Sequence, residues 1–288
     1  MERGRIFPWL DEKETPHLTQ MERIMITIYM FGVVTIPQLM VITGWPKSKV
    51  MAALNRIRRQ GKTPEGKNDW LIYWVPGPGK PYIYTLGQKS IEHVCAIRKE
   101  QIGNGKRKKR PHKKGHMWHF LGFNEIICRL LGGGVPVDEF MVGKEVMSWI
   151  YHKLIQRKYI RDEERVEVDR PDFLPVKPDG LVEVNGEEYF LEYDTGSEPA
   201  LKLRERLERY IDFYPMLKDR HKGFPTTLWI TVTPNRRATI ERVAQQINEK
   251  WSDVWSRPTF PKMYTLVEGE EVDFLKGHLE IDPFWEGE

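Results

Sequence analysis

The chain has 288 residues, enough for two domains with separate hydrophobic cores, and its hydrophobic content of 40% is ordinary for a globular protein. It contains neither an apolar run of about 18 residues nor a signal-peptide core, so we expect a cytoplasmic protein with no membrane contact. The net charge of +4 hides an asymmetry, because residues 1–115 carry 22 Lys and Arg against 9 Asp and Glu, whereas the remainder carries 23 against 32. A basic half of +13 followed by an acidic half of −9 predicts that the first half binds a polyanion.

Three short helices are predicted after an N-terminal tail of residues 1–16. A Thr and a Glu with capping-box spacing begin the first helix, which we expect over residues 19–31. A second Thr is the expected N-cap of a helix that ends near residue 42. The third helix is expected from about residue 46 or 47 to 60, where a glycine follows as a stop signal. Three helices with a tight turn before the last predict a helix-turn-helix, in which the third helix enters the major groove of DNA.

The third helix has a polar face rich in cations, and a predicted β-hairpin follows it. The residues of this face that we expect to contact DNA are Lys47, Lys49, Asn55, Arg56, Arg58 and Arg59. Within this set, Asn55 suits adenine and Arg56 suits guanine at base edges. Strand-like segments at 70–75 and 82–86 flank a Pro- and Gly-rich turn whose Lys80 would reach the phosphate backbone. Residues 17–101 therefore read as a winged-helix domain that binds double-stranded DNA, or, alternatively, as a winged helix that contacts protein and has a solvated arginine face.

Residues 102–115 form the predicted boundary between two domains. The segment from Gly103 to Gly115 contains 7 Lys and Arg and no acid, so it cannot bury a core and reads as a basic linker. We expect its cations to add salt-sensitive contacts with phosphates, with a solvated tether as the alternative. The cations assigned to this contact are Lys106, Arg107, Lys108, Lys109 and Arg110.

Residues 116–288 show alternating helical and strand patterns, which predict a mixed sheet flanked by helices. The expected helices cover 116–131, 198–214 and 236–251, and the expected strands cover 139–142, 146–151, 180–184, 187–193, 227–233 and 264–267. The fold class predicted for the whole chain is thus α+β with two domains, the second being an α/β domain.

A hairpin in this domain brings acids together. The dipeptide Asn185-Gly186 between two apolar-alternating runs predicts a two-residue turn, and counting outward from it places Asp179 opposite Glu192. Asp194 points to the same face as Glu192 because side chains alternate along a strand. Three convergent carboxylates predict a site for a hard, oxygen-liganded cation such as Mg²⁺ or Mn²⁺, with no small-molecule cofactor.

An Asp on one strand and Glu-x-x on its hairpin partner, after a helix, resembles the PD-(D/E)xK nuclease superfamily. The resemblance implies a restriction-endonuclease-like fold in which Asp179 and Glu192 hold a metal and Glu125 completes its ligands. Asp194 stands where the superfamily has lysine, and three interpretations stay open. A cation of the next helix could replace that lysine, with Lys202 nearest and Arg206 and Arg209 on the same face; Asp194 could be a further metal ligand; or the site could be a nuclease relic that only binds DNA.

The whole pattern from about residue 18 to 247 resembles the replication-relaxation family of plasmids and other mobile elements. The phrases that carry this resemblance are HMWHFLGFNEIICRLL, KPDG, YFLEYDTGSEPALKLRERLERY and TTLWITVTPNRRATIERV. The resemblance implies DNA binding in replication initiation or relaxation, and in this family Glu-x-Asp is usual. Two hypotheses follow: a Mg²⁺-dependent endonuclease or nickase in which Asp179, Glu192, Asp194 and Lys202 act, or a noncatalytic initiator or repressor with a degenerate nuclease domain. A homodimer on an inverted repeat is compatible with either.

Overall fold

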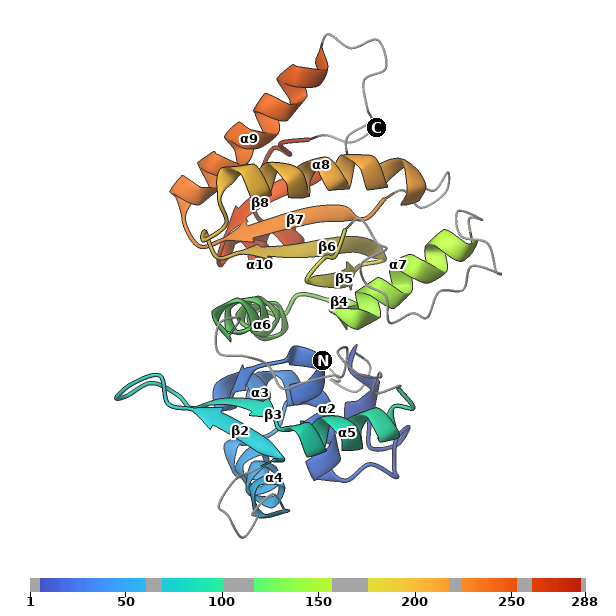
Figure 1. Cartoon of the computed structure of the whole chain (residues 1–288), viewed down its shortest axis with the longest axis vertical. Coiled ribbons are helices and arrows are strands. Elements are labelled where there is room, and N and C mark those ends of the chain that lie inside the picture. The colour runs from blue at the N-terminus through green and yellow to red at the C-terminus, as the bar shows by residue number, and fades with distance from the viewer. Residues whose placement is uncertain are drawn as a thin grey trace. The chain divides into compact units, whose positions relative to one another are not determined.

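The computed structural model divides the chain into two compact units, Met1–Gly134 and Val135–Glu288, and each has its own sheet and helices (Figure 1). The structure describes residues 6–60, 69–100, 117–156, 176–217, 224–252 and 261–285. Of the helices that it describes, none is both long and apolar enough to cross a membrane.

The N-terminal unit combines helices with a small antiparallel sheet. Its elements are η1 (Pro8–Leu10), α2 (Gln20–Phe31), β1 (Val34–Thr35), α3 (Ile36–Thr43), α4 (Lys47–Gln60), β2 (Leu71–Trp74), β3 (Ile83–Leu86), α5 (Gln88–Ile97) and α6 (Met117–Gly132). The described strands pair in the order β1-β3-β2. The three predicted helices and both strands of the predicted hairpin are confirmed to within about one residue at each end.

Local capping sets the starts of α2 and α3. The Thr19 hydroxyl accepts a hydrogen bond from the Glu22 amide (3.2 Å), and the Glu22 carboxylate accepts one from the Thr19 amide (2.8 Å). Thr35 and Gln38 make the same reciprocal pair at α3. Each box pairs two amides that the helix itself leaves without acceptors, which is why the Thr and Glu spacing located the first helix and the second Thr marked the start of the next.

The segment expected to be an N-terminal tail is packed into this unit from Ile6 onward. Phe7 is fully buried, and the buried Trp9 donates from its indole nitrogen to the Thr27 hydroxyl (3.0 Å). Arg23 of α2 is also buried and donates to the carbonyl oxygen of Trp9 (2.5 Å). A buried guanidinium requires acceptors, and backbone carbonyls of this segment supply them.

Helix α6 packs within the N-terminal unit, although we expected it to open the second domain at residue 116. Asn124 donates from its side-chain amide to the carbonyl oxygens of Val33 (2.6 Å) and Phe31 (3.2 Å). Gln38 of α3 donates to the carbonyl oxygen of Leu121 (2.9 Å). The first compact unit therefore ends after Gly134 and not at residue 101.

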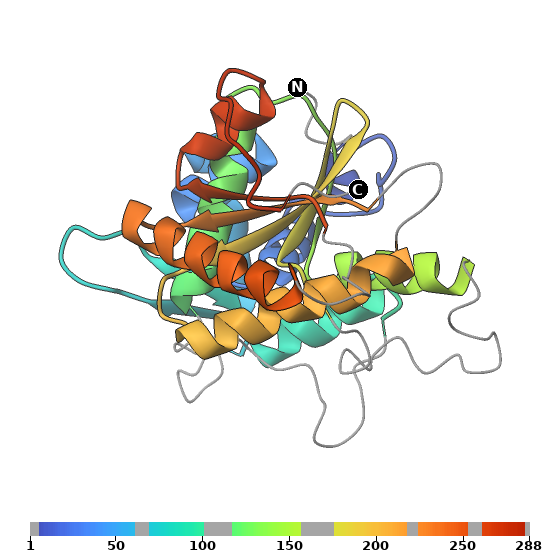
Figure 2. The ribbon, with the colours of Figure 1, turned by 90° about the horizontal axis from the view of Figure 1, so that it is seen from above.

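The C-terminal unit has a five-stranded sheet in its described part, in the order β4-β5-β6-β7-β8. Its elements are β4 (Val137–Val142), α7 (Lys144–Gln156), β5 (Gly180–Val184), β6 (Glu187–Asp194), α8 (Ala200–Leu217), β7 (Thr226–Thr231), α9 (Pro234–Ser252), β8 (Met263–Val267) and α10 (Glu270–Leu275). Strands β4, β5 and β6 run antiparallel, and β6, β7 and β8 run parallel. Helices α8 and α9 cover one face of this sheet and α10 lies on the other (Figures 1 and 2), so the predicted mixed sheet flanked by helices is confirmed.

The strand predicted over residues 146–151 is wrong, because this segment lies inside helix α7. Val146, Ile150 and Leu154 are fully buried, and their spacing of four places them on one helical face. They join a core that also contains Phe190 of β6 and Leu207 of α8. The short apolar run fits both the two-residue period of a strand and the 3.6-residue period of a helix. Leu154, which lies beyond the predicted strand, shows that the period is helical.

Candidate functional site

The β5–β6 hairpin has the predicted turn and register. Asn185 and Gly186 both have positive φ angles, 52° and 80°, as a type I′ turn requires. Continuing the observed pairing by one residue places Asp179 opposite Glu192. The Asp179 carboxylate accepts a hydrogen bond from the amide of Tyr193 (2.8 Å), which holds it beside β6.

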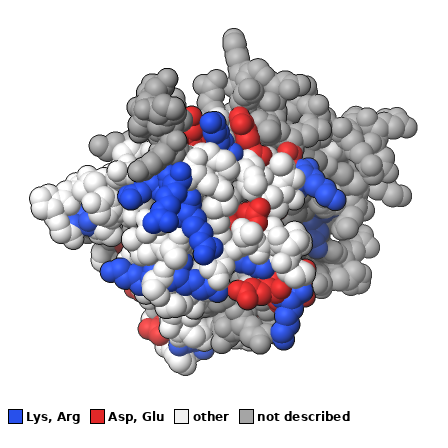
Figure 3. Space-filling view, turned by 90° about the horizontal axis from the view of Figure 1, so that it is seen from below, with Lys and Arg blue, Asp and Glu red and all other residues white. Residues whose placement is uncertain are grey.

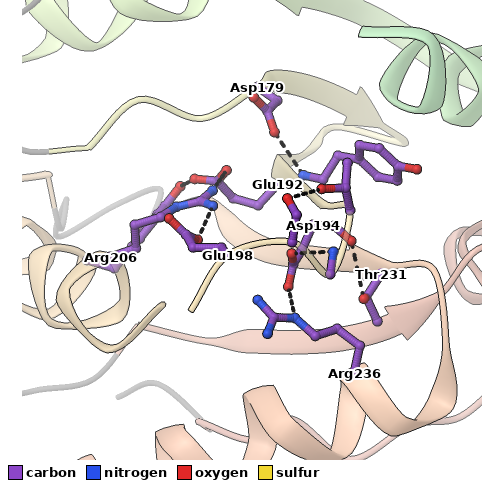
Figure 4. A network of polar contacts seen from close by, with 12 residues as sticks. Asp179, Glu192, Asp194, Glu198, Arg206, Thr231 and Arg236 are labelled. Atoms are coloured by element: carbon purple, nitrogen blue, oxygen red, sulfur yellow. Dashed lines mark hydrogen bonds and ion pairs between the residues drawn. The ribbon is translucent and has the colours of Figure 1, made fainter. Parts of the chain in front are cut away.

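Glu192 lies at the centre of a buried polar network on the face of the sheet that α8 covers (Figure 4). Its Oε1 accepts from the Tyr210 hydroxyl (2.6 Å), and its Oε2 accepts from Arg206 (2.5 Å). Arg206 also donates to Glu198 (2.9 Å), and its guanidinium carbon lies 4.8 Å from the centre of the Trp229 ring. One arginine of α8 is thus held between two carboxylates and an aromatic face.

Burial and charge act against each other on this network. Burial raises the pKa of Glu192 to about 7, Arg206 pulls that pKa down, and Asp179 pushes it up. For Arg206, burial would lower the pKa, but Glu192 and Glu198 outweigh it and raise the pKa. Burial and the Glu192 charge raise the pKa of Tyr210 well above its usual value. Arg206 therefore stays charged and Tyr210 stays protonated, while Glu192 is the member that titrates near neutral pH.

Asp194 ends β6 in a second ion pair. Its Oδ1 accepts from the amide of Gly196 (2.8 Å), and its Oδ2 accepts from Arg236 Nε (2.6 Å). Asp194 is buried, and Arg236 comes from the first turn of α9. Gly196 has a φ of 78°, and a Cβ added there would lie 3.5 Å from Val232, which precedes α9, and 3.9 Å from Arg236 in α9. Asp194 therefore ties the end of β6 to the start of α9.

Two of the predicted site residues have surroundings other than those expected. Lys202 is exposed, and the cation of α8 that contacts Glu192 is Arg206, one turn further on. Glu125 belongs to the N-terminal unit, where its carboxylate accepts from the Gln38 side-chain amide (3.2 Å). Asp179 and Glu192 come together as expected.

As arranged here, the carboxylates do not fit a resident Mg²⁺. Both oxygens of Glu192 and both of Asp194 already accept hydrogen bonds, in each case one of them from an arginine. A divalent cation would have to displace these guanidinium groups or share the carboxylates with them. Within the described ranges, no group of three or more His, Cys, Asp or Glu side chains is placed to hold a metal ion. Binding of Mg²⁺ or Mn²⁺ stays a prediction. The ion pairs of Glu192 and Asp194 with arginines argue against it.

The predicted DNA contacts of the N-terminal unit lie on α4 and on the β2–β3 turn. Those whose side chains are exposed are Lys47, Arg56, Arg58, Arg59 and, at the β2–β3 turn, Lys80. Asn55 is half-buried, and Lys49 is engaged, with its ammonium 3.2 Å from Glu12 and 4.0 Å from the centre of the Trp45 ring. Figure 3, viewed from the side of α4, shows Lys and Arg side chains gathered on this face. The five cations predicted between 106 and 110 lie outside the described residues.

A comparison with protein families decides the membership of the chain. The family described as replication-relaxation matches residues 26–227, from within α2 to the second residue of β7. The chain belongs to the replication-relaxation family. The match includes α4 and both Asp179 and Glu192, and it ends before Arg236. Searches of curated proteins and of solved structures give no significant match.

Arg236 is one residue of this site that sequence reasoning missed. Strands β6 and β7 are parallel, with Asp194 beside Thr231, so the chain leaving β7 passes Asp194. The sequence TPNRR, which begins one residue after that strand, was the available signal, because parallel neighbours end at the same edge of a sheet. It could be used only with the strand order known.

Proposed function

We propose that this chain binds duplex DNA in the replication or relaxation of a plasmid or other mobile element, and that α3, α4 and the β2–β3 hairpin act as a winged helix-turn-helix. The observation that carries the proposal is the order α2-β1-α3-α4-β2-β3, with a β1-β3-β2 sheet and the exposed cations on α4. In a helix-turn-helix, that last helix is the one that enters the major groove. Family membership supports the setting of replication.

The exposed cations of α4 and the half-buried Asn55 divide into two roles in this proposal. Arg56 and Asn55, near the middle of the helix, would reach base edges, where Arg pairs with guanine and Asn with adenine. Lys47 and Arg59, at its two ends, would contact phosphates on either side of the groove. Lys80 at the hairpin turn would add a phosphate contact. The binding is therefore salt-sensitive, because each neutralised phosphate releases counterions.

For the C-terminal unit we propose a PD-(D/E)xK-like fold that has lost cleavage. The support is the pairing of Asp179 with Glu192, which suits a nuclease, together with the ion pairs of Glu192 and Asp194, which occupy the oxygens that a metal would need. On this ground we propose the noncatalytic initiator or repressor rather than the Mg²⁺-dependent nickase.

The binding proposal is tested by titrating a fluorescent duplex with the wild-type chain and with the double variant Arg56→Ala/Arg59→Ala. We expect the variant to bind about tenfold or more weakly and to show a reduced salt slope. Lys89→Ala is the matched control, since Lys89 is an exposed cation of the same unit on α5. Equal loss in the control, or no loss in the double variant, would contradict the assignment to α4.

Cleavage is tested on supercoiled plasmid with Mg²⁺ or Mn²⁺ at saturating protein. We expect the plasmid to stay supercoiled. Nicked or linear product that disappears in both Asp179→Asn and Glu192→Gln would instead establish the nuclease and reject the noncatalytic hypothesis. Product that persists in both variants would indicate a contaminant, and the expectation would then stand for the purified chain.

A further inference from the structure

Three tyrosines share one face of the β2–β3 hairpin. Tyr73 pairs directly with Tyr84. Tyr82 comes just before β3, two residues ahead of Tyr84, and its ring contacts both of the others, so all three side chains lie on one side. The ring centres of Tyr73 and Tyr82 are 5.9 Å apart. The ring centre of Tyr84 lies 6.5 Å from that of Tyr73 and 6.4 Å from that of Tyr82. On the other side of the hairpin, Ile83 is buried and Trp74 packs against it in the core.

This tyrosine face, defined by Tyr73, Tyr82 and Tyr84, is open to solvent. Tyr73 is 48% exposed and Tyr82 is 47% exposed, and Val75 beside them is 57% exposed. Only two other large hydrophobic side chains among the described residues are exposed, Trp118 and Leu201. A cluster of half-exposed rings on a projecting hairpin exceeds the scattered apolar residues of an ordinary surface and indicates a binding site.

The charge around this face is positive. Arg58 of α4 lies close enough that its charge lowers the pKa of Tyr84, against a larger rise caused by burial. Lys80 stands at the turn of the same hairpin, and α4 packs beside β2. The ligand that fits is therefore anionic and has flat, exposed rings. Unpaired nucleotides have both properties, whereas the bases of a duplex are already stacked on each other.

We propose that the tyrosine face of the β2–β3 hairpin binds single-stranded DNA by stacking its rings on unpaired bases, with Arg58 and Lys80 along the phosphates. The inference rests on the proposed function and extends it, because a chain that holds duplex through α4 would also hold one separated strand beside it. Replication begins with strand separation, so a site of this kind would stabilise the opened state. Stacking tolerates any base, and the site would show little sequence preference.

The test compares three fluorescent probes on the full chain: a dT oligonucleotide of about 20 nucleotides, an abasic oligonucleotide of the same length, and a duplex of mixed sequence. The wild type should bind the dT probe at least about fivefold more tightly than the abasic probe, since both carry the same phosphates. The variant Tyr73→Ala/Tyr82→Ala should lose about 5- to 150-fold in dT affinity per lost base contact and keep its duplex affinity. Tyr73→Phe/Tyr82→Phe retains the rings and should bind dT as the wild type does.

Each outcome separates this inference from the proposed function. Equal wild-type affinity for the dT and abasic probes overturns stacking without requiring any variant, so the test does not depend on how the Ala variant folds. Unchanged dT binding in a folded Ala variant also overturns stacking. The tyrosine face would then be a binding site for a protein partner. Equal loss of dT and duplex binding in the Ala variant assigns the face to duplex contact instead. In each of these cases, duplex binding by the wild type leaves the proposed function standing. That function fails only if the wild type does not bind duplex.

Discussion

At the scale of single residues, the buried network around Glu192 is a balance between desolvation and pairing. Removing a carboxylate and a guanidinium from water costs several kcal/mol each, and a buried pair recovers this only with good geometry and further hydrogen bonds. Glu192 has both, since Arg206 and Tyr210 each bind one of its oxygens, and Arg206 has Glu198 and the Trp229 ring besides. The network therefore fixes how α8 sits on the sheet of the C-terminal unit.

The raised pKa of Glu192 predicts a pH dependence of stability. In the unfolded chain this carboxyl has an ordinary pKa near 4.5, and in the folded chain its pKa is about 7. The folded state therefore binds more protons between these values, so the stability that Glu192 contributes is fully present below pH 4.5 and is lost as pH rises through 7. The slope in this window is at most about 1.4 kcal/mol per pH unit.

The measurement is the free energy of unfolding in urea at several pH values from 5 to 8, for the wild type and for Glu192→Gln. Gln cannot ionise, so the variant should lack the Glu192 part of the slope while keeping contributions from other groups. We expect the free energy of unfolding of the wild type to be highest at low pH. Between pH 5 and 7 it should fall more steeply than that of the variant. Parallel curves would contradict the assignment of this titration to Glu192.

The sequence predicted part of this site because only part of it is local. The opposition of Asp179 and Glu192 follows from a two-residue turn, which fixes the register of its strands. The pairing of Arg236 with Asp194 depends on which strand lies beside β6 and where α9 begins. Both depend on the tertiary arrangement of segments far apart in the sequence. The local sequence around Arg236 indicates nothing of this arrangement beyond its positive charge.

At the scale of elements, capped helices were predictable and short apolar runs were not. Helices α2 and α3 begin with reciprocal side-chain and backbone hydrogen bonds, which leave a clear spacing in the sequence. Helix α7 was predicted as a strand because the run from Val146 to Tyr151 is short and apolar, so that its period is ambiguous. Helix α10 has six residues, Glu270–Leu275, too few to show a helical period.

The β2–β3 hairpin depends on one close backbone approach, which Gly87 permits. A Cβ at Gly87 would lie 2.2 Å from the carbonyl oxygen of Asp69, and the Gly87 amide donates to the carbonyl of Trp70 (2.8 Å). Gly87→Ala should therefore force the start of β2 away from α5 and destabilise the chain by about 1–3 kcal/mol or more. Urea denaturation measures this.

Gly77→Ala is the matched control for Gly87, because Gly77 lies in the turn of the same hairpin and a Cβ there would meet nothing within 4 Å. Its free energy of unfolding should stay close to that of the wild type. A Gly87 variant as stable as the Gly77 variant would show that the contact between residues 69 and 87 relaxes at no cost.

At the scale of the whole molecule, charge and packing divide the chain at different places. The basic run before residue 116 suggested a boundary there, because a polyionic segment cannot bury a core. Packing sets the boundary after Gly134, since α6 is apolar on the face that meets α3 and β1. The net charge of residues 1–134 is +13, from 23 Lys and Arg and 10 Asp and Glu. Residues 1–115 have the same net charge, so moving the boundary leaves the N-terminal unit equally basic.

This difference predicts how two fragments behave. Residues 1–134 should fold cooperatively and bind duplex DNA, with an affinity that falls steeply between about 50 and 200 mM salt. Residues 1–115 keep nearly all the cations but lose α6, which leaves the carbonyl oxygens of Phe31 and Val33 without the Asn124 amide and exposes the buried Ile83. We expect this shorter fragment to be less stable by several kcal/mol, because buried apolar area and two hydrogen bonds are lost together. Urea denaturation of both fragments, followed by duplex titration at two salt concentrations, measures the effect. If the fragment of residues 1–115 matched the longer one in stability, α6 would be an appendage of the N-terminal unit and the boundary at residue 116 would be restored.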